Sequence, residues 1–444
     1  MAEARPRAPR GGRAALGRLT SSPTVESARA FLSTNPLGRY VLPLTLLALA
    51  FAYPFWYDLP GIRLITLNVL GVDLELIILV AVYVLLALGL NVVVGYAGLL
   101  DLGYVAFYAL GAYTVGWFGS DLFSQLDFHL ASTANADLPG IHINFWLLLI
   151  LGGVVTAIAG VIIGWPTLRL RGDYLAIVTL GFGEIIPDVF RNADAIPVPS
   201  GFQATPPFIA FDPANLTDGV RGVRLLDRPG FGDRIDNATN GIFLDRFGSI
   251  DLLPWFFTIM TLVLITIFVN VRLRDSKMGR AWIAVREDEV AASAMGVPLM
   301  RTKLWAYGIG AIFGGIVGVF YGSFIGSVFP TSFFFNISVI ILCMVIVGGM
   351  GNIYGVVLGA VVLQYLNVRG LDKIGERLND GLDKVGIDKT IDVPKYKFLI
   401  FGILLVIMML FRPQGLIPEA RREAEFREPE VEEVREPVLY EART

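Results

Sequence analysis

The sequence is poor in charged residues, histidine and cysteine. Charged residues make up 17% of its 444 positions, against about 25% in a typical soluble domain, and they cluster between long apolar segments. This distribution favours a membrane protein over a chain of two or three soluble domains. The single cysteine, Cys343, excludes a disulfide within the chain.

The residue patterns of common catalytic and nucleotide-binding sites are also missing. The two histidines, His129 and His142, do not have the His-Glu-x-x-His spacing of a zinc site. No Gly-x-x-x-x-Gly-Lys-Ser/Thr loop is present to hold nucleotide phosphates. A net charge of −3 without a basic stripe gives no sign of nucleic-acid binding. We therefore expect this chain to be no enzyme and to bind no metal or cofactor itself.

Ten apolar segments have about the length that a bilayer core requires, roughly 20 residues per helix. The sequence therefore predicts an all-α polytopic membrane protein with about ten transmembrane helices. Glycine-rich breaks at 95–103 and 348–352 interrupt two apolar stretches, and each break is either a surface turn or an unwound stretch inside the protein. The ten segments are 40–57, 74–97, 103–119, 145–164, 174–191, 252–271, 304–327, 334–349, 352–367 and 396–412.

Lysines and arginines in short loops orient the spans, because cytoplasmic loops carry an excess of them. Segment 272–303 carries seven lysines and arginines. If the chain has ten spans, this segment lies on the same side of the membrane as the arginine-rich residues 1–39 and the turn 165–173, which also contains arginines. We therefore predict that both termini are cytoplasmic. The predicted parts are a disordered basic tail at 1–39, a transmembrane domain at 40–412 with outer loops at 193–250 and 368–395 and a cytoplasmic loop at 272–303, and a charged tail at 413–444.

One predicted span has a face without side chains. Five glycines recur at every fourth position and therefore lie along one stripe of a helix, where another helix can approach closely. They are Gly310, Gly314, Gly318, Gly322 and Gly326.

Segment 279–298, between two predicted spans, has the features of a short helix. Acidic residues occupy its first turn, where the helix dipole favours negative charge. Small residues follow, and a glycine with a nearby proline ends the helix. Such an element is equally consistent with a docking helix and with a capped surface connector. The residues expected to form the docking site are Arg286, Glu287, Asp288, Glu289, Ala291, Ala292 and Gly296.

The same segment carries a resemblance to a known family. Glu289-x-Ala291-Ala292-x-x-x-Gly296 resembles the coupling-helix motif Glu-Ala-Ala-x-x-x-Gly of ABC importer permeases, with Val290 inserted. The segments 88–103, 168–184 and 411–416 resemble, in family order, the LivM-type permeases of branched-chain amino acid importers. The resemblance implies a permease subunit of an ATP-driven importer in the bacterial inner membrane, which passes leucine, isoleucine or valine by alternating access.

The resemblance also implies partners. They are a LivH-like sister permease, two cytoplasmic ATPases that hold the ATP and magnesium, a periplasmic binding protein and the lipid bilayer. Permeases for urea or short-chain amides look similar and remain an alternative. A secondary transporter without ATP is a further alternative, which would need a coupling-ion site and no docking helix. The loop after Asn192 is longer than the family usually has.

Acidic groups inside spans are costly and therefore suggest function. Glu184 either lines the substrate path and meets the ammonium group of an amino acid, or pairs with an arginine near a membrane face. Asp101 is interpreted as part of a cytoplasmic turn. The residues expected along the path are Asn91, Gly95, Gly98, Thr179, Gly181, Gly183 and Glu184.

Overall fold

The computed structural model describes residues 50–55, 71–124, 126–131, 138–170, 172–194, 215–229, 251–384, 392–412 and 414–417. The chain divides into two units, and the second begins at Val69. Of the first unit, residues 50–55 are described and are helical. The predicted tail 1–39, all of the tail 413–444 except residues 414–417, most of the first predicted span and most of the loop 193–250 lie outside the described residues.

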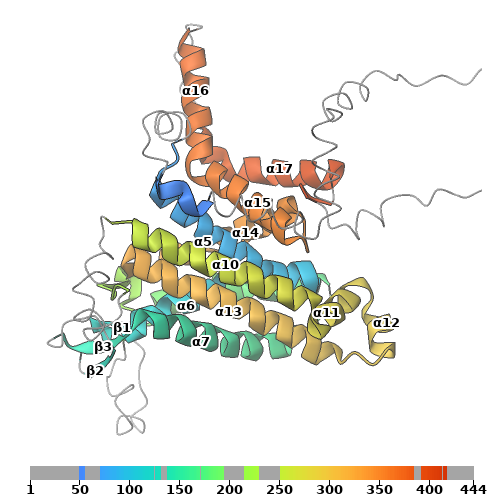
Figure 1. Cartoon of the computed structure of the whole chain (residues 1–444), viewed down its shortest axis with the longest axis horizontal. Coiled ribbons are helices and arrows are strands. Elements are labelled where there is room, and N and C mark those ends of the chain that lie inside the picture. The colour runs from blue at the N-terminus through green and yellow to red at the C-terminus, as the bar shows by residue number, and fades with distance from the viewer. Residues whose placement is uncertain are drawn as a thin grey trace, which may run out of the picture. The chain divides into compact units, whose positions relative to one another are not determined.

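The second unit is almost entirely helical (Figure 1). Short strands and turns connect the helices at one end. The helices are α5 (Leu74–Leu90), α6 (Val105–Phe118), α7 (Phe145–Thr167), α8 (Asp173–Arg191), α10 (Leu253–Asp275), α11 (Lys277–Glu287), α12 (Glu289–Ala294), α13 (Leu299–Ile325), α14 (Phe335–Gly348), α15 (Ile353–Tyr365), α16 (Leu371–Lys384) and α17 (Lys397–Phe411). The strands are β1 (Gly119–Ser120), β2 (Asp127–Leu130), β3 (Gly140–Ile143), β4 (Val223–Arg224) and β5 (Ser327–Val328).

Within the described residues, seven helical stretches are long and apolar enough to cross a membrane. Nine of the ten predicted segments coincide with helices, which confirms the class of polytopic membrane protein. Helices α6 and α8 are not among the seven stretches, because α6 has only 14 residues and α8 carries charges on one face. Part of the predicted loop 368–395 is helical, because α15 continues through the π-helical turn η6 (Leu366–Gly370) into α16.

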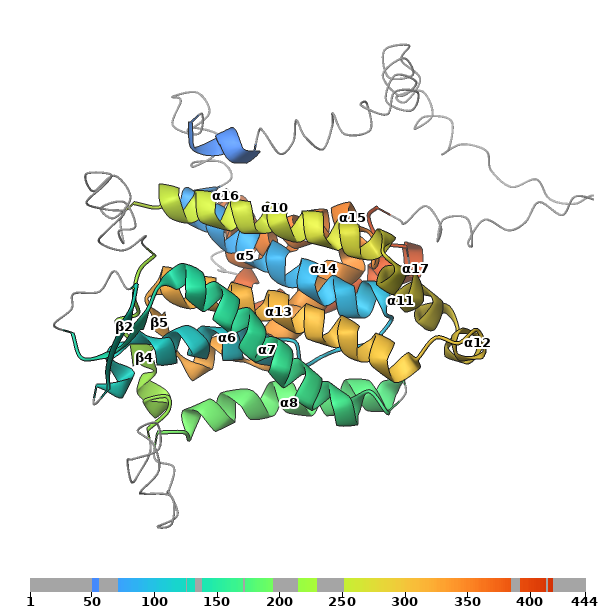
Figure 2. The same cartoon turned by 60° about the horizontal axis from the view of Figure 1, so that its bottom comes forward.

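Helix α13 is the central helix and packs against α5, α6 and α7 (Figures 1 and 2). The glycines on its predicted stripe lie where neighbouring backbones come close. A β-carbon at Gly318 would collide with the carbonyl oxygen of Tyr108, and one at Gly310 with Val93. Gly315, outside the stripe, lies equally close to the backbone of Gly152 on α7. The absence of side chains therefore allows α13 to sit between two helices.

Gly326 does not belong to this packing surface. A β-carbon there would meet no atom within 4 Å. The residue ends α13 in the left-handed conformation, with φ +74°, and its N–H donates to the carbonyl of Gly322. The spacing of the glycines continues past the packed face to the helix end, so the fifth glycine has a capping role instead.

The two ends of the bundle differ in character. One end, here called the basic end, holds α11 and α12 and the basic segment 272–303 (Figure 1). The other, the sheet end, holds the three-stranded sheet in the order β1-β3-β2 and the antiparallel pair of β4 with β5. At the sheet end, His142 Nδ1 lies 2.8 Å from Asp227 Oδ2 and ties β3 to the segment after β4. Burial raises the pKa of the Asp227 carboxyl, although the hydrogen bond with His142 opposes this shift.

The two glycine-rich breaks have different structures. The break at 348–352 is a tight turn between the antiparallel helices α14 and α15, and Asn352 caps α15 by accepting from the N–H of Tyr354 at 3.0 Å. The break after Gly95 is an unwound segment, residues 97–104, that runs into the protein. Tyr104 donates to the carbonyl of Gly310, near the middle of α13, at 3.0 Å. Helix α6 therefore begins near mid-height of the bundle.

A substitution of Gly318 by alanine should destabilise the protein, because the added carbon meets the rigid backbone of α6. We expect a loss of about 1–3 kcal/mol, the usual cost of overpacking, seen as a lower unfolding temperature in detergent. Gly308→Ala is the matched control on the same helix, since its β-carbon would make only an ordinary contact of 3.5 Å with Val161. Equal effects of the two changes would contradict the packing described here.

Candidate functional site

The short helix α12 forms an exposed tip at the basic end (Figure 1). Asp288 begins it, and its carboxylate accepts from the N–H groups of Val290 at 2.7 Å and Ala291 at 3.0 Å. Its C-terminus is closed by Gly296 at φ +85°, where a residue with a side chain would be strained, and the N–H of Val297 returns to the carbonyl of Ala292. The side chain of Asp288 and the backbone of Gly296 therefore define the two ends of a helix of 6 residues.

The predicted members of α12 need one correction. Glu287 does not stand in its first turn: it is the last residue of α11, and the chain is extended at Asp288. Asp288 is the N-cap of α12, so only Glu289 lies in the first turn of that helix, and Glu287 precedes the cap. The exposed surface of α12 is instead apolar, with Val290 69% and Met295 85% exposed.

Two contacts fix this tip to the membrane helices. Glu289 forms an ion pair with Lys303 at the start of α13, with Oε1 2.5 Å from Nζ. Trp282 of α11 is fully buried, and its indole N–H donates to the carbonyl of Thr302 at 2.8 Å. Helices α11 and α12 are therefore both tied to the start of α13.

Arg286 connects the same loop to the first break. Its guanidinium donates to the carbonyl of Gly95, at the end of the π-helical turn η2 (Asn91–Tyr96). The stem of the side chain fills the space beside Gly98, where any β-carbon would collide with it. Gly98 also has φ +70°. Arg286 thus points into the protein rather than outward toward a docking surface.

From Gly98 the unwound segment 97–104 continues to α8. The N–H of Leu102 donates to Thr179 Oγ1 at 3.0 Å, and Gly103 lies directly against the backbone of Thr179 and beside Gly183. Asp101 is 1% exposed and accepts from the N–H of Gly103 at 2.9 Å. The interpretation of Asp101 as a residue of a surface turn is therefore wrong, because the segment is buried between helices.

Asn91 joins the two breaks to each other. It is fully buried in η2, and its carbonyl oxygen accepts from the N–H of Gly351 at 2.9 Å. Gly95, one turn later, leaves room for both this side chain and the Gly351 backbone. Asn91 therefore has a structural contact at the basic end of the bundle and lies apart from Glu184.

Helix α8 divides its residues between two faces. Leu175, Thr179, Gly183 and Pro187 are buried, whereas Glu184 and Asp188 are exposed on the opposite face. Gly181 is half-buried, and a β-carbon there would meet nothing within 4 Å. The structure thus separates the predicted path residues into a buried group that anchors α8 and an exposed group on its outer face.

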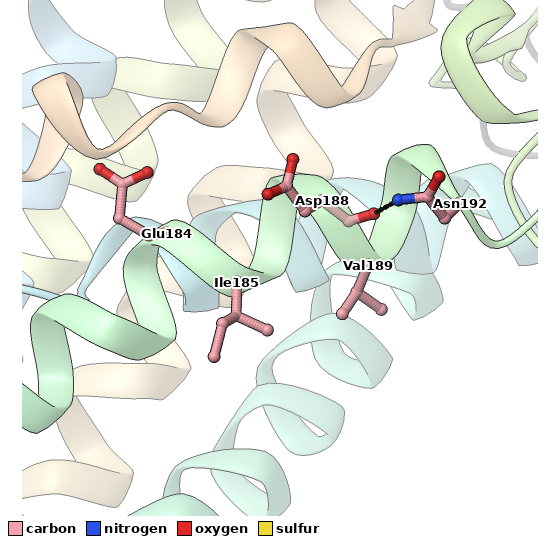
Figure 3. Close-up of a pocket in the computed structure, with 5 residues that line it drawn as sticks. All are labelled: Glu184, Ile185, Asp188, Val189 and Asn192. Atoms are coloured by element: carbon pink, nitrogen blue, oxygen red, sulfur yellow. Dashed lines mark hydrogen bonds between the residues drawn. The ribbon is translucent and has the colours of Figure 1, made fainter.

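The exposed face of α8 holds an open pocket of about 380 Å³, lined by Glu184, Ile185, Asp188, Val189 and Asn192. Figure 3 shows both carboxylates projecting from one side of the helix, with the two aliphatic side chains on the adjacent side. Among the described residues, no lysine or arginine lies within ion-pair distance of Glu184. Asp188 was missed by the sequence analysis, although its spacing of four residues from Glu184 placed it on the same helix face.

Comparison with known proteins decides the family. Residues 74–409 match the model of the permease component of branched-chain amino acid transport systems. The chain belongs to this permease family. Members of the family are subunits of membrane transporters, so the chain is a multi-pass membrane transport protein of the ABC permease type rather than an enzyme.

Several curated permeases are similar over most of the chain. The high-affinity branched-chain amino acid permease LivM of Salmonella typhimurium is 35% identical over 386 residues, which cover 85% of this chain and 75% of that protein. LivM of Escherichia coli is 35% identical, over 85% of this chain and 74% of its own. LivH of Salmonella typhimurium is 23% identical over 342 residues, which cover 77% of this chain and 93% of that protein. No experimentally solved structure matches the chain.

The bond between Leu102 and Thr179 should hold the unwound segment of this permease in place. Thr179→Val keeps the shape of the side chain and removes the hydrogen-bond acceptor of the Leu102 N–H. The unpaired N–H should destabilise the folded segment by about 1–3 kcal/mol. We expect amide exchange at Leu102 to rise by about 5- to 150-fold, measured by hydrogen–deuterium exchange of peptides that cover 97–104. Thr114→Val is the control, because Thr114 bonds only within its own helix; unchanged exchange in Thr179→Val would contradict this anchoring.

Proposed function

We propose that this chain is the LivM-type subunit of an ATP-driven importer that carries leucine, isoleucine or valine across the bacterial inner membrane. It would span the membrane ten times, with both termini and the basic end in the cytoplasm. The observation that carries the proposal is the contact of Arg286 with Gly95 and Gly98, because it joins α11, the helix that leads into the exposed α12, to the unwound segment inside the membrane domain.

ATPase subunits would dock on α12. Its exposed Val290 and Met295 offer an apolar knob, and small residues beside them make the helix thin enough to enter a groove. Two cytoplasmic ATPases would supply the ATP and magnesium, since this sequence has no phosphate-binding loop. Such a docking helix distinguishes the proposal from a secondary transporter, which needs none.

A sister permease of the LivH kind would face α8. Ionised carboxylates are costly against lipid, so the face with Glu184 and Asp188 requires water or another protein. The pocket on this face is open in the single chain, and a second permease placed against it would close a path between the two subunits. A periplasmic binding protein would deliver the substrate at the sheet end.

The substrate path would combine negative charge with apolar walls. Glu184 and Asp188 can attract the ammonium group of an amino acid, while Ile185 and Val189, 54% and 50% exposed, can contact an aliphatic side chain. The names of the LivM relatives favour branched-chain amino acids. Urea or a short amide has no aliphatic group to match these side chains and remains the alternative substrate class.

Transport would proceed by alternating access. Closure of the ATPases would displace α12, and the rigid contacts of Glu289 and Trp282 would move α13 and α11 with it. Arg286 would pull on the segment 97–104, which holds α8 through Thr179. The carboxylates of α8 would then face the two sides of the membrane in turn.

Reconstitution of the complete importer tests the proposed function. With the sister permease, ATPases and binding protein, we expect ATP-dependent uptake of radiolabelled leucine into vesicles. Uptake of urea with leucine left outside would overturn the substrate but leave the ABC permease. Leucine uptake driven by an ion gradient without ATP would instead establish a secondary transporter.

Loss of Arg286 should uncouple ATP hydrolysis from transport. In Arg286→Ala, we expect leucine uptake to fall by about 5- to 150-fold, the usual range of coupling between sites, while the assembled complex retains ATP hydrolysis. Arg280→Ala on the same helix is the matched control, because Arg280 bonds only to the carbonyl of Asp275 at 2.8 Å. Equal uptake in the two variants would show that the route does not pass through Arg286.

A further inference from the structure

Helix α16 has an apolar stripe that the transport mechanism does not use. Apolar residues recur at helical spacing along one side, and charged residues occupy the other. Asp372, Glu376, Arg377 and Asp380 of the charged side are exposed. The stripe consists of Leu371, Ile374, Gly375 and Leu378.

The helix lies across the direction of the spans. In Figure 1, α5, α10 and α13 run horizontally, whereas α16 stands upright at the sheet end and extends away from the bundle. Because the spans run along the membrane normal, α16 lies parallel to the membrane plane at the level where α15 ends.

The stripe faces the side from which the next span enters the membrane. A β-carbon at Gly375 would lie 3.5 Å from Val393, in the short helix η7 (Val393–Tyr396) that leads directly into α17. Leu371, at the base of the stripe, is buried. Further out, Ile374 is 49% and Leu378 44% exposed. Among the described residues, protein therefore covers the stripe only near the bundle.

The neighbouring span continues this uncovered apolar surface. Helix α17 exposes Leu399, Ile403 and Val406, at 61%, 51% and 63%, as a helix in contact with acyl chains does. Its first turn is flanked by Lys395 and the exposed Tyr396, residue types that anchor spans at the boundary between headgroups and acyl chains. The stripe of α16 is thus connected through η7 to a span with an exposed apolar surface.

We propose that α16 is an interfacial helix that rests on the outer leaflet, with Ile374 and Leu378 inserted among the acyl chains and the charged side facing water. Helices of this kind bury their apolar face about 5–10 Å into the boundary between headgroups and acyl chains. Lipid at this position would hold the connection between α15 and α17 parallel to the membrane while the bundle rearranges.

Spin labels placed on the two sides of α16 test the proposal. Cysteines at Ile374 and Leu378, with Glu376 and Asp380 as matched controls, are introduced into a Cys343→Ala chain and labelled. The full chain is reconstituted in vesicles of phosphatidylethanolamine and phosphatidylglycerol. We expect labels at Ile374 and Leu378 to collide several-fold more with oxygen than with a water-soluble nickel complex, and the controls to show the reverse.

Two other results would overturn the proposal. High nickel accessibility at all four positions would place α16 in water. Low accessibility of Ile374 and Leu378 to both reagents would show that a protein surface covers the stripe, such as a second copy of the chain. If Cys343→Ala prevents reconstitution, the native chain serves as the background, with the spectrum of its buried cysteine subtracted.

Discussion

The side chain of Arg286 packs against Gly98, where a β-carbon on any other residue would collide with it. Its guanidinium satisfies the carbonyl of Gly95, which the π-helical turn leaves without its usual helical partner, and its stem lies against Gly98. A positive φ at Gly98 turns the chain out of α5 and into the bundle. The unwound segment, the late start of α6 and the anchoring of α8 all depend on this contact, because each follows from where the chain leaves Gly98.

Backbone inside a membrane domain must find internal hydrogen bonds, because lipid offers none. The segment 97–104 and the first residue of α6 meet this requirement through hydrogen bonds to three helices. Thr179 of α8 accepts from Leu102 and Ser338 of α14 accepts from Val105 at 2.9 Å, while Tyr104 donates to the backbone of α13. These bonds make the segment a junction of α8, α13 and α14.

Several features could be predicted from the sequence because they depend on local pattern. Hydropathy placed nine helices near their observed bounds, and the glycine-rich breaks marked both interruptions. The C-terminus of α12 followed from Gly296 and Pro298. Three interpretations were wrong for reasons of tertiary structure. Glu287 belongs to the preceding helix, Gly326 caps a helix instead of packing, and Asp101 is buried; periodicity cannot report which atoms from distant segments surround a residue.

By itself, the sequence determined the membrane class, the positions of the spans and the family, because apolar length and motif order are properties of the chain alone. Only the tertiary structure decided which break is a turn and which is a buried segment. It also separated the predicted path residues, placing Asn91 and Gly95 with Arg286 and leaving Glu184 with Asp188 on an open face. The physical reason is that these contacts join residues up to 260 positions apart, and their geometry exists only when the helices are packed.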